Sequence, residues 1–130
     1  MKKLIYLTIF LLVTGAFTNQ ISAQSSWVAP KSADEIENPI KNDIEATKKG
    51  KKLYRQMCVI CHGAKGKGDG VGGTSLKPKP VDFTLKEIQA QSDGSLFWKI
   101  TEGRTPMAAY NMLNDKQRWQ LVNYIRTLKQ

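Results

Sequence analysis

Two cysteines and the only histidine of this 130-residue chain stand together as Cys58-Val59-Ile60-Cys61-His62. This pentad fits C-x-x-C-H, in which two thiols attach to the vinyl groups of a porphyrin and the next histidine binds the iron. Zinc would need more nitrogen and sulfur ligands than the chain retains. A redox C-x-x-C would stand near a βαβ pattern, which the sequence lacks, and a disulfide across two residues would restrict the unfolded chain very little. The motif therefore predicts one covalently attached haem c.

The N-terminus has the pattern of a secretory signal. Lys2 and Lys3 precede an apolar run over Leu4–Val13, and small and polar residues follow. We expect cleavage near Ala23, so that residues 1–23 are the signal peptide. The apolar run is too short for a confident membrane span, so the mature protein is expected to be exported to the periplasm without one. Loss of the two lysines lowers the formal net charge from +9 to +7. Nucleic acid would be the usual partner for this charge, but export argues against it.

The rest of the chain divides into an arm and one domain. Residues 24–43 are polar, contain Pro30 and Pro39, and have Trp27 in their only apolar patch. We expect them to form an extended arm, with Trp27 anchored on the domain. Residues 44–130 suit a single small domain, in which a buried macrocycle would supply apolar contacts that the chain alone lacks.

Helical patterns dominate this domain, and no segment alternates with a period of two, so we predict an all-α fold. A capping box at Asn42 and Glu45 opens the first helix, and Gly50 on its apolar face indicates the close approach of another element. Three more helices are predicted. A short one follows a capping box at Thr84 and Glu87, and a second is capped by Ser92 or Asp93 and ends at Gly103. The last helix begins with a capping box at Asn114 and Gln117 and runs to about Leu128.

Taken in order, these residues resemble monohaem class I cytochrome c. The resemblance covers about residues 44–130 and rests on Gly50-x-x-Leu53-Tyr54 before the pentad, then a glycine-rich loop, prolines, a methionine loop and an aromatic C-terminal helix. It implies a cytochrome c fold, in which the N-terminal and C-terminal helices cross at right angles and a covalent haem lies in the core. It also implies that Gly50 and Tyr54 pack against the last helix.

The resemblance gives further residues a role around the haem. The carbonyl of Pro78 or Pro80 would accept a hydrogen bond from the ring of His62, which fixes the imidazole and raises its basicity. The sequence leaves open which proline does this. Candidates for contact with the haem or its propionates, for which ordinary packing is an equal alternative, are Arg104, Trp98 and Tyr110.

The resemblance also points to the iron ligands. His62 is the proximal ligand, and Met57 lies beside the pentad on the same helix, where it cannot reach the opposite face. Met107 and Met112 remain. Met107 lies in a loop about 45 residues after His62, as the family pattern has it, and is the expected distal ligand. Met112 stands against the start of the last helix and is expected in the core.

With both axial positions filled, no substrate reaches the iron, so the resemblance implies an electron carrier rather than an enzyme. Its expected partners are acidic redox proteins, such as membrane-bound respiratory oxidase or reductase complexes, steered by charge around an exposed haem edge. Two alternatives stay open: a cytochrome subunit of a larger redox enzyme, and a haem-based sensor with a labile distal methionine. The lysines expected around that edge are Lys65, Lys67, Lys77 and Lys79.

Overall fold

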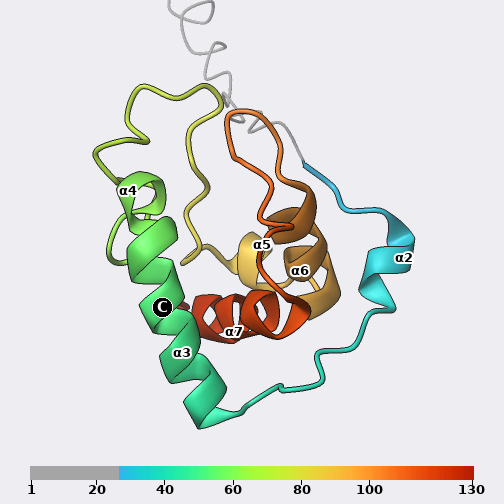
Figure 1. The fold of residues 1–130 in the computed structure, drawn as a ribbon. Helices are drawn as coiled ribbons and strands as arrows, with labels where there is room; N and C mark the ends of the chain where they lie inside the picture. The colour runs from blue at the N-terminus through green and yellow to red at the C-terminus, as the bar shows by residue number, and fades with distance from the viewer. Residues whose placement is uncertain (1–26) are drawn as a thin grey trace, which may run out of the picture.

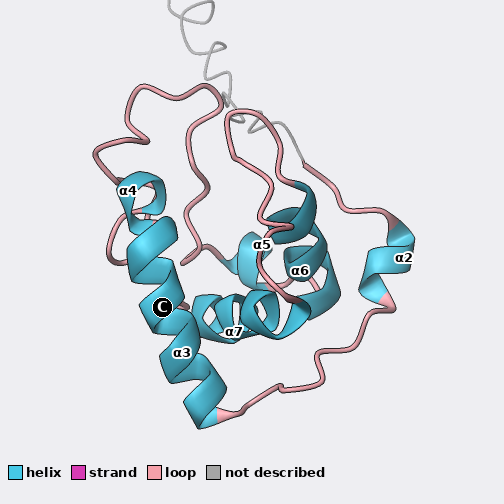
Figure 2. Ribbon diagram, viewed as in Figure 1, coloured by secondary structure: helices cyan, strands magenta, loops and turns pink. Residues whose placement is uncertain are grey.

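The computed structural model describes residues 27–130, so the predicted signal peptide and the first residues of the arm lie outside the described part (Figure 1). This part is helical and contains no strand, only an isolated bridge between Arg104 and Met107 (Figure 2). The all-α prediction is confirmed. No helix within residues 27–130 is long and apolar enough to cross a membrane. The helices are α2 (Lys31–Asp34), α3 (Ile44–Met57), α4 (Val59–His62), α5 (Lys86–Gln89), α6 (Asp93–Glu102) and α7 (Asp115–Arg126).

The crossing of α3 and α7 forms the centre of the fold, with α7 running across α3 in Figure 1. A Cβ placed on Gly50 would lie 1.8 Å from the carbonyl oxygen of Gln120, so only glycine permits this approach. One turn later the ring of Tyr54 meets that of Tyr124 edge-on, with centroids 5.0 Å apart. The Tyr54 hydroxyl donates to the carbonyl oxygen of Gly63 at 2.8 Å. The predicted crossing of the N-terminal and C-terminal helices of the domain is confirmed.

The hydrophobic core is built around α7, which is buried on all sides over residues 118–125, and is completed by α3 and α6. Its most deeply buried large side chains are Tyr54, Leu121 and Val122. In the N-terminal half of α7, the ring of Trp119 stacks on that of Phe97 from α6, with centroids 4.1 Å apart. Full burial of such side chains stabilises a fold by about 1.5–3 kcal/mol each. The core therefore holds α6 and α7 together while leaving part of the α3–α7 junction open to a cavity.

Helix α3 begins one residue later than the capping box predicts. Asn42 has a φ of 65°, and Asp43 is the N-cap, whose side chain accepts from the backbone nitrogen of Ala46 at 2.9 Å. Glu45 forms an ion pair with Lys48 instead of reaching back to the cap. The predicted capping box at Asn42 and Glu45 is therefore wrong. Asn42 takes the left-handed conformation, and Asp43 caps the helix in its place.

The caps of α6 and α7 agree with the sequence. The Ser92 hydroxyl accepts from the backbone nitrogen of Ser95, and Gly103 ends α6 with a φ of 64°. Asn114 and Gln117 form the complete reciprocal box at the start of α7, which ends at Arg126, slightly before the predicted end. Ser92 and Ser95, like Asn114 and Gln117, are three residues apart, the spacing at which a cap side chain reaches a free backbone nitrogen of the first turn.

The predicted box at Thr84 is wrong. The Thr84 hydroxyl and backbone nitrogen both donate to the carboxylate of Asp82, at 2.7 and 2.8 Å. Helix α5 then follows Leu85 without a side-chain cap. The threonine side chain is used in a turn before the helix, which leaves it unavailable as a cap.

One turn of helix, α2, interrupts the arm that we expected to be extended throughout. Ala33 is almost fully buried, and a Cβ on Gly94 would lie 1.9 Å from its carbonyl oxygen, so the backbone of the arm rests directly on α6. The rings of Trp27 and Trp98 pack together with centroids 6.2 Å apart. The predicted anchoring of Trp27 on the domain is confirmed.

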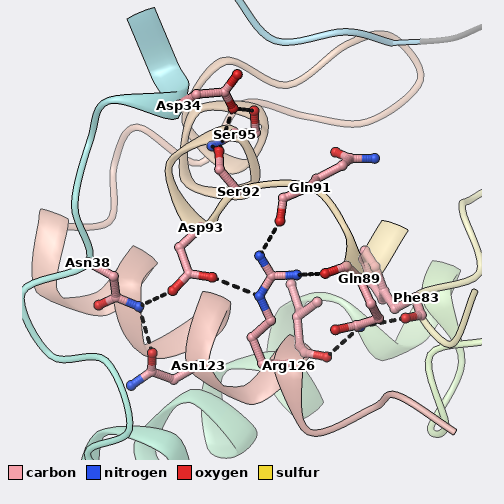
Figure 3. A network of polar contacts seen from close by, with 11 residues as sticks. Asp34, Asn38, Phe83, Gln89, Gln91, Ser92, Asp93, Ser95, Asn123 and Arg126 are labelled. Atoms are coloured by element: carbon pink, nitrogen blue, oxygen red, sulfur yellow. Dashed lines mark hydrogen bonds and ion pairs between the residues drawn. The ribbon is translucent and has the colours of Figure 1, made fainter. Parts of the chain in front are cut away.

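A polar network fastens the arm to α6 and α7 (Figure 3). The amide of Asn38 donates to the carboxylate of Asp93 at 3.0 Å and to the side chain of Asn123 at 2.8 Å. Arg126 donates to the second carboxylate oxygen of Asp93 at 2.7 Å. The outer bonds of the network run from Ser92 and Ser95 to Asp34, and from Arg126 to the carbonyls of Gln89 and Gln91.

Candidate functional site

An open cavity beside the α3–α7 crossing brings the pentad and the methionine loop together. Cys58, Cys61, His62 and Met107 all line it. Thiols, an imidazole and a thioether thus surround one space with a mainly apolar wall, and these residues fit a planar, largely apolar macrocycle with an iron at its centre. The apolar wall includes Tyr54, Val81, Phe83, Ile100, Leu121 and Ile125.

The ring of His62 is held in one tautomer. Its Nδ1 lies 3.2 Å from the carbonyl oxygen of Val81, and because a carbonyl only accepts, Nδ1 carries the proton and the Nε2 lone pair is left for a metal. Phe83 stacks on the imidazole with ring centroids 4.5 Å apart. Burial lowers the pKa of His62, opposed in part by the bond to Val81, so the ring is neutral near pH 7. This is the form of histidine that binds iron.

The prediction that Pro78 or Pro80 accepts this hydrogen bond is wrong, because the acceptor is Val81. The carbonyl oxygen of Pro80 faces Gly68 instead, where an added Cβ would lie 2.3 Å from it. Both prolines still line the cavity. Consecutive carbonyls along the segment point in different directions, and the proline spacing does not tell which of them faces the ring.

The two thiols are not bonded to each other, and their surroundings do not suit a redox pair. Burial, and then the neighbouring Cys61, raise the pKa of Cys58 to about 12, whereas redox C-x-x-C pairs depend on a lowered thiol pKa. The backbone nitrogen of His62 donates to the carbonyl of Cys58 at 2.8 Å, so one turn carries both thiols and the imidazole. Residues 27–130 contain no cluster of three or more His, Cys, Asp and Glu that could hold another metal.

The two methionines considered for the distal position lie in different surroundings. Met107 is half-buried, lines the cavity and exchanges backbone hydrogen bonds of 2.7 and 3.0 Å with Arg104. Met112 is 67% exposed, so its predicted place in the core is wrong: the adjacent Leu113 takes the buried position. Met57 also lines the cavity, at the end of α3. The role of Met107 as a ligand stays a prediction.

Two of the three predicted haem contacts line the cavity. Arg104 and Tyr110 do so, and the Tyr110 hydroxyl donates to the carbonyl of Met57 at 3.2 Å. Trp98 does not line it, and its ring packs on Trp27, which lines the cavity in its place. The contact of Trp98 with the haem stays a prediction. Trp27 is predicted only as an anchor, because no local pattern shows which surface of the domain an arm will cover.

The lysines expected around the cavity are exposed in the structure. They lie on the loops between His62 and Val81, and Lys79 also lines the cavity. Apolar side chains accompany them: Ile60 is 56% and Val71 80% exposed.

Comparison with known proteins gives one family. Residues 45–125 match the family model described as cytochrome C oxidase, cbb3-type, subunit III. A chain of the Kuenenia stuttgartiensis reducing HAO-like protein complex Kustc0457/Kustc0458 is similar with a TM-score of 0.63 and 29% identity, over 73% of this chain and 50% of that one. The chain thus spans about half the length of that structure. The KustC0563 c-type cytochrome is similar with a TM-score of 0.53 and 32% identity, over 62% of this chain and 98% of that one. No curated protein matches the sequence.

Proposed function

Because the chain belongs to the cytochrome c family, as a monohaem class I member with covalently bound haem c, we propose that it carries single electrons between redox proteins outside the cytoplasm. Its role as a haem electron-transfer protein follows from the family. The observation that most supports an electron carrier is the fixed tautomer of His62, which lines one cavity together with Cys58, Cys61 and Met107.

Each of these residues has a distinct task in the proposal. Cys58 and Cys61 would hold the haem through two thioether bonds, and the free Nε2 of His62 would bind its iron. The sulfur of Met107 would be the second protein ligand, and a thioether in this role favours ferrous iron and so would raise the midpoint potential. When bound, the haem supplies an iron couple that gains and loses one electron.

The protein around the site restricts the chemistry to electron exchange. Tyr54, Leu121 and Ile125 are buried and line the cavity, so they exclude water from the face they cover. If His62 and Met107 both bound the iron, they would leave no position on it for oxygen or an organic substrate. A low-dielectric wall also reduces the reorganisation that accompanies a change of charge.

The exposed lysines on the loops beside the cavity, which we call the lysine rim, indicate the kind of partner; they are Lys65, Lys67, Lys77 and Lys79. Positive charge next to an exposed apolar surface favours acidic redox proteins, which bind in brief encounters through small interfaces. We propose membrane-bound respiratory oxidases or reductases as these partners, and the periplasm as the compartment. The compartment rests on the signal-like residues 1–23, which lie outside the described part.

A second candidate is a cytochrome subunit of a larger redox enzyme. The matching family model is described by an oxidase subunit, and one similar structure is a chain of a protein complex. Purification of the native protein under gentle conditions distinguishes the two. A free carrier elutes near the mass of the monomer, whereas a subunit elutes with other chains in fixed stoichiometry.

The proposed function is tested by the chemistry of the purified protein. Acid–acetone extraction should leave the haem on the wild type, and Cys58→Ala or Cys61→Ala should weaken that retention. A redox titration should follow a one-electron curve, and the reduced protein should not bind carbon monoxide at neutral pH. Extraction of all the haem would contradict covalent attachment, and ready carbon monoxide binding would favour a sensor over a carrier.

A further inference from the structure

The loop that joins α6 to α7 carries Met107 and folds back on its own start (Figure 1). Arg104 and Met107 exchange two backbone hydrogen bonds, of 3.0 and 2.7 Å, across a tight turn. A Cβ on Gly103 would lie 2.5 Å from the backbone of Ala108, so the two sides of this turn are in contact. The backbone nitrogen of Tyr110 then donates to a carbonyl of α6 at 3.0 Å. These bonds lie within the loop or join it to α6, and none of them relates Met107 to the helix that ends at the pentad.

A side-chain hydrogen bond does join the loop to that helix. The Tyr110 hydroxyl donates to the carbonyl oxygen of Met57, the last residue of α3, at 3.2 Å. The carbonyls at the end of a helix need partners from elsewhere. The amide four residues after Met57, that of Cys61, donates to the carbonyl of Cys58 instead. Tyr110 therefore supplies a donor to the end of α3 from a segment 53 residues away.

The surroundings of Tyr110 make this bond persistent. Its ring packs against the core and lines the cavity, and a tyrosine has only two rotatable side-chain bonds. Burial, and then the neighbouring Cys58 and Cys61, raise the pKa of Tyr110, so its hydroxyl stays protonated near neutral pH and can donate. The contact thus fixes the distance between the loop and α3 more firmly than a long, flexible side chain would.

We propose that Tyr110 is a positioning residue for the distal ligand. Its hydroxyl ties the Met107 loop to the end of α3, which continues through Cys58 into the turn that carries His62. Both side chains are thereby placed relative to one helix, His62 through the chain itself and Met107 through Tyr110, three residues on. This inference rests on the proposed binding of the iron by Met107, and it adds the contact that holds the sulfur in place.

Loss of the hydroxyl should make the sulfur of Met107 easier to displace. Added imidazole binds ferric haem only where that sulfur has left the iron, so its apparent affinity rises with the fraction of open sites. Tyr110→Phe removes one neutral hydrogen bond and keeps the ring. The ferric variant should therefore bind imidazole about 2- to 10-fold more tightly than the wild type.

Tyr124→Phe is the matched control, because it removes the same group from a tyrosine of α7 that packs on Tyr54 and does not line the cavity. Its affinity for imidazole should stay close to that of the wild type.

Hydrogen exchange measures the loop without an added ligand. The backbone amides of Met107 and Tyr110 are hydrogen-bonded, and they exchange when the loop opens locally. Relative to the amides of α7, they should exchange faster in Tyr110→Phe than in Tyr124→Phe. This ratio separates a freer loop from a general loss of stability, which would speed exchange in α7 as well.

The inference is overturned if Tyr110→Phe and Tyr124→Phe bind imidazole equally and their loop amides exchange alike. The weak far-red absorption band of a methionine sulfur on ferric haem reports separately on the proposed function. A wild type that shows the band, with imidazole binding unchanged in Tyr110→Phe, would contradict the positioning role and leave the ligand assignment intact. A wild type without the band would overturn the assignment of Met107 and this inference with it.

Discussion

The Nδ1 of His62 and the carbonyl oxygen of Val81 lie 3.2 Å apart, which ties the thiol-bearing turn to the far end of the glycine-rich loop. Between them the loop folds back closely enough that the carbonyl of Pro80 faces Gly68. The hydrogen bond makes the imidazole a better electron donor, which favours ferric iron. The path of this loop should therefore affect the potential as well as the stability.

Gly68→Ala should disturb this relationship. Gly68 has a φ of 72°, and a Cβ would lie 2.3 Å from the Pro80 carbonyl, so the backbone must shift. We expect a loss of about 1–2 kcal/mol in unfolding free energy from the backbone conformation alone. The midpoint potential should rise because the bond to His62 weakens. Urea unfolding and redox titration measure the two effects.

Gly72→Ala is the control for that change. Gly72 is exposed, its φ is outside the strained range, and the atom nearest to an added Cβ belongs to the flexible side chain of Ile60. It should shift stability and potential much less. Equal effects from Gly68→Ala and Gly72→Ala would show that the loop path does not tune the imidazole.

Gly50→Ala tests the helix crossing. Intrinsic helix propensity favours alanine by about 0.8–1.0 kcal/mol. The added Cβ would lie 1.8 Å from the carbonyl oxygen of Gln120, a backbone atom that cannot rotate away. We expect net destabilisation of about 1–3 kcal/mol by urea unfolding, as for overpacked cores. Lys51→Ala, at an exposed position of α3, should be nearly neutral. A stabilised Gly50→Ala protein would mean that the helices separate without cost.

The parts of the structure that the sequence predicted are those that depend on neighbouring residues. Asn114 and Gln117 cap each other across one turn, and the thiols and imidazole share another. Gly50 was also informative, since a glycine on the apolar face of a helix has few reasons other than close contact. These local patterns predicted the fold class and the turn that carries both thiols and the imidazole, whereas the place of Met107 at the cavity was predicted from the family resemblance.

Two local predictions fail, because Asp43 caps α3 in place of Asn42 and Asp82 takes the hydroxyl of Thr84. The errors around the site concern side chains whose position depends on tertiary packing. Met112 and Leu113 are adjacent apolar residues, and only the path of the chain into α7 decides which is buried. Trp27 of the arm lines the cavity and packs on Trp98, a placement that depends on how the arm docks and that no local pattern predicts. Val81, and not either proline, accepts the hydrogen bond from His62 because of the direction in which its carbonyl points, and residue types do not predict that direction.

The docked arm should be sensitive to acid. Burial raises the pKa of Asp93, but hydrogen bonds from Asn38 and Arg126 outweigh this, so the folded pKa lies below 3.8. The carboxylate therefore stabilises the fold above the unfolded pKa, and this contribution is lost as the pH falls through the folded pKa. Asp93→Asn should cost about 1–3 kcal/mol at pH 7, with a smaller difference from wild type near pH 3. Urea unfolding from pH 3 to pH 7 measures both.

Glu87→Gln is the matched control for the acid experiment, because Glu87 is exposed and lies outside the network. It should leave the pH dependence of unfolding close to that of the wild type. If Asp93→Asn also leaves that dependence unchanged, the carboxylate does not hold the arm in place.

The lysine rim should steer electron transfer. Charge reversal at Lys65, Lys67 and Lys77, which do not line the cavity, should slow electron transfer to an acidic partner while leaving the midpoint potential almost unchanged. Reversal of Lys79, which lines the cavity, should slow the transfer and also lower the potential. The wild-type rate should fall as ionic strength rises, because salt screens the attraction. Stopped-flow measurement of the rate over a range of salt concentrations tests both. Reversal of Lys49 and Lys52, exposed on α3, is the control and should slow the rate less. A wild-type rate independent of salt would remove the steering role.

The central claim is that His62 and Met107 hold the iron from opposite sides, and the far-red absorption band of the ferric protein tests it most directly. This weak band arises from a methionine sulfur bound to ferric haem. We predict that the wild type and Met112→Ala, whose side chain is exposed, both show the band. Met107→Ala should lose it, with a lower midpoint potential and new carbon monoxide binding in the reduced state. A Met107→Ala protein that keeps the band, or a wild type that lacks it, would contradict the claim.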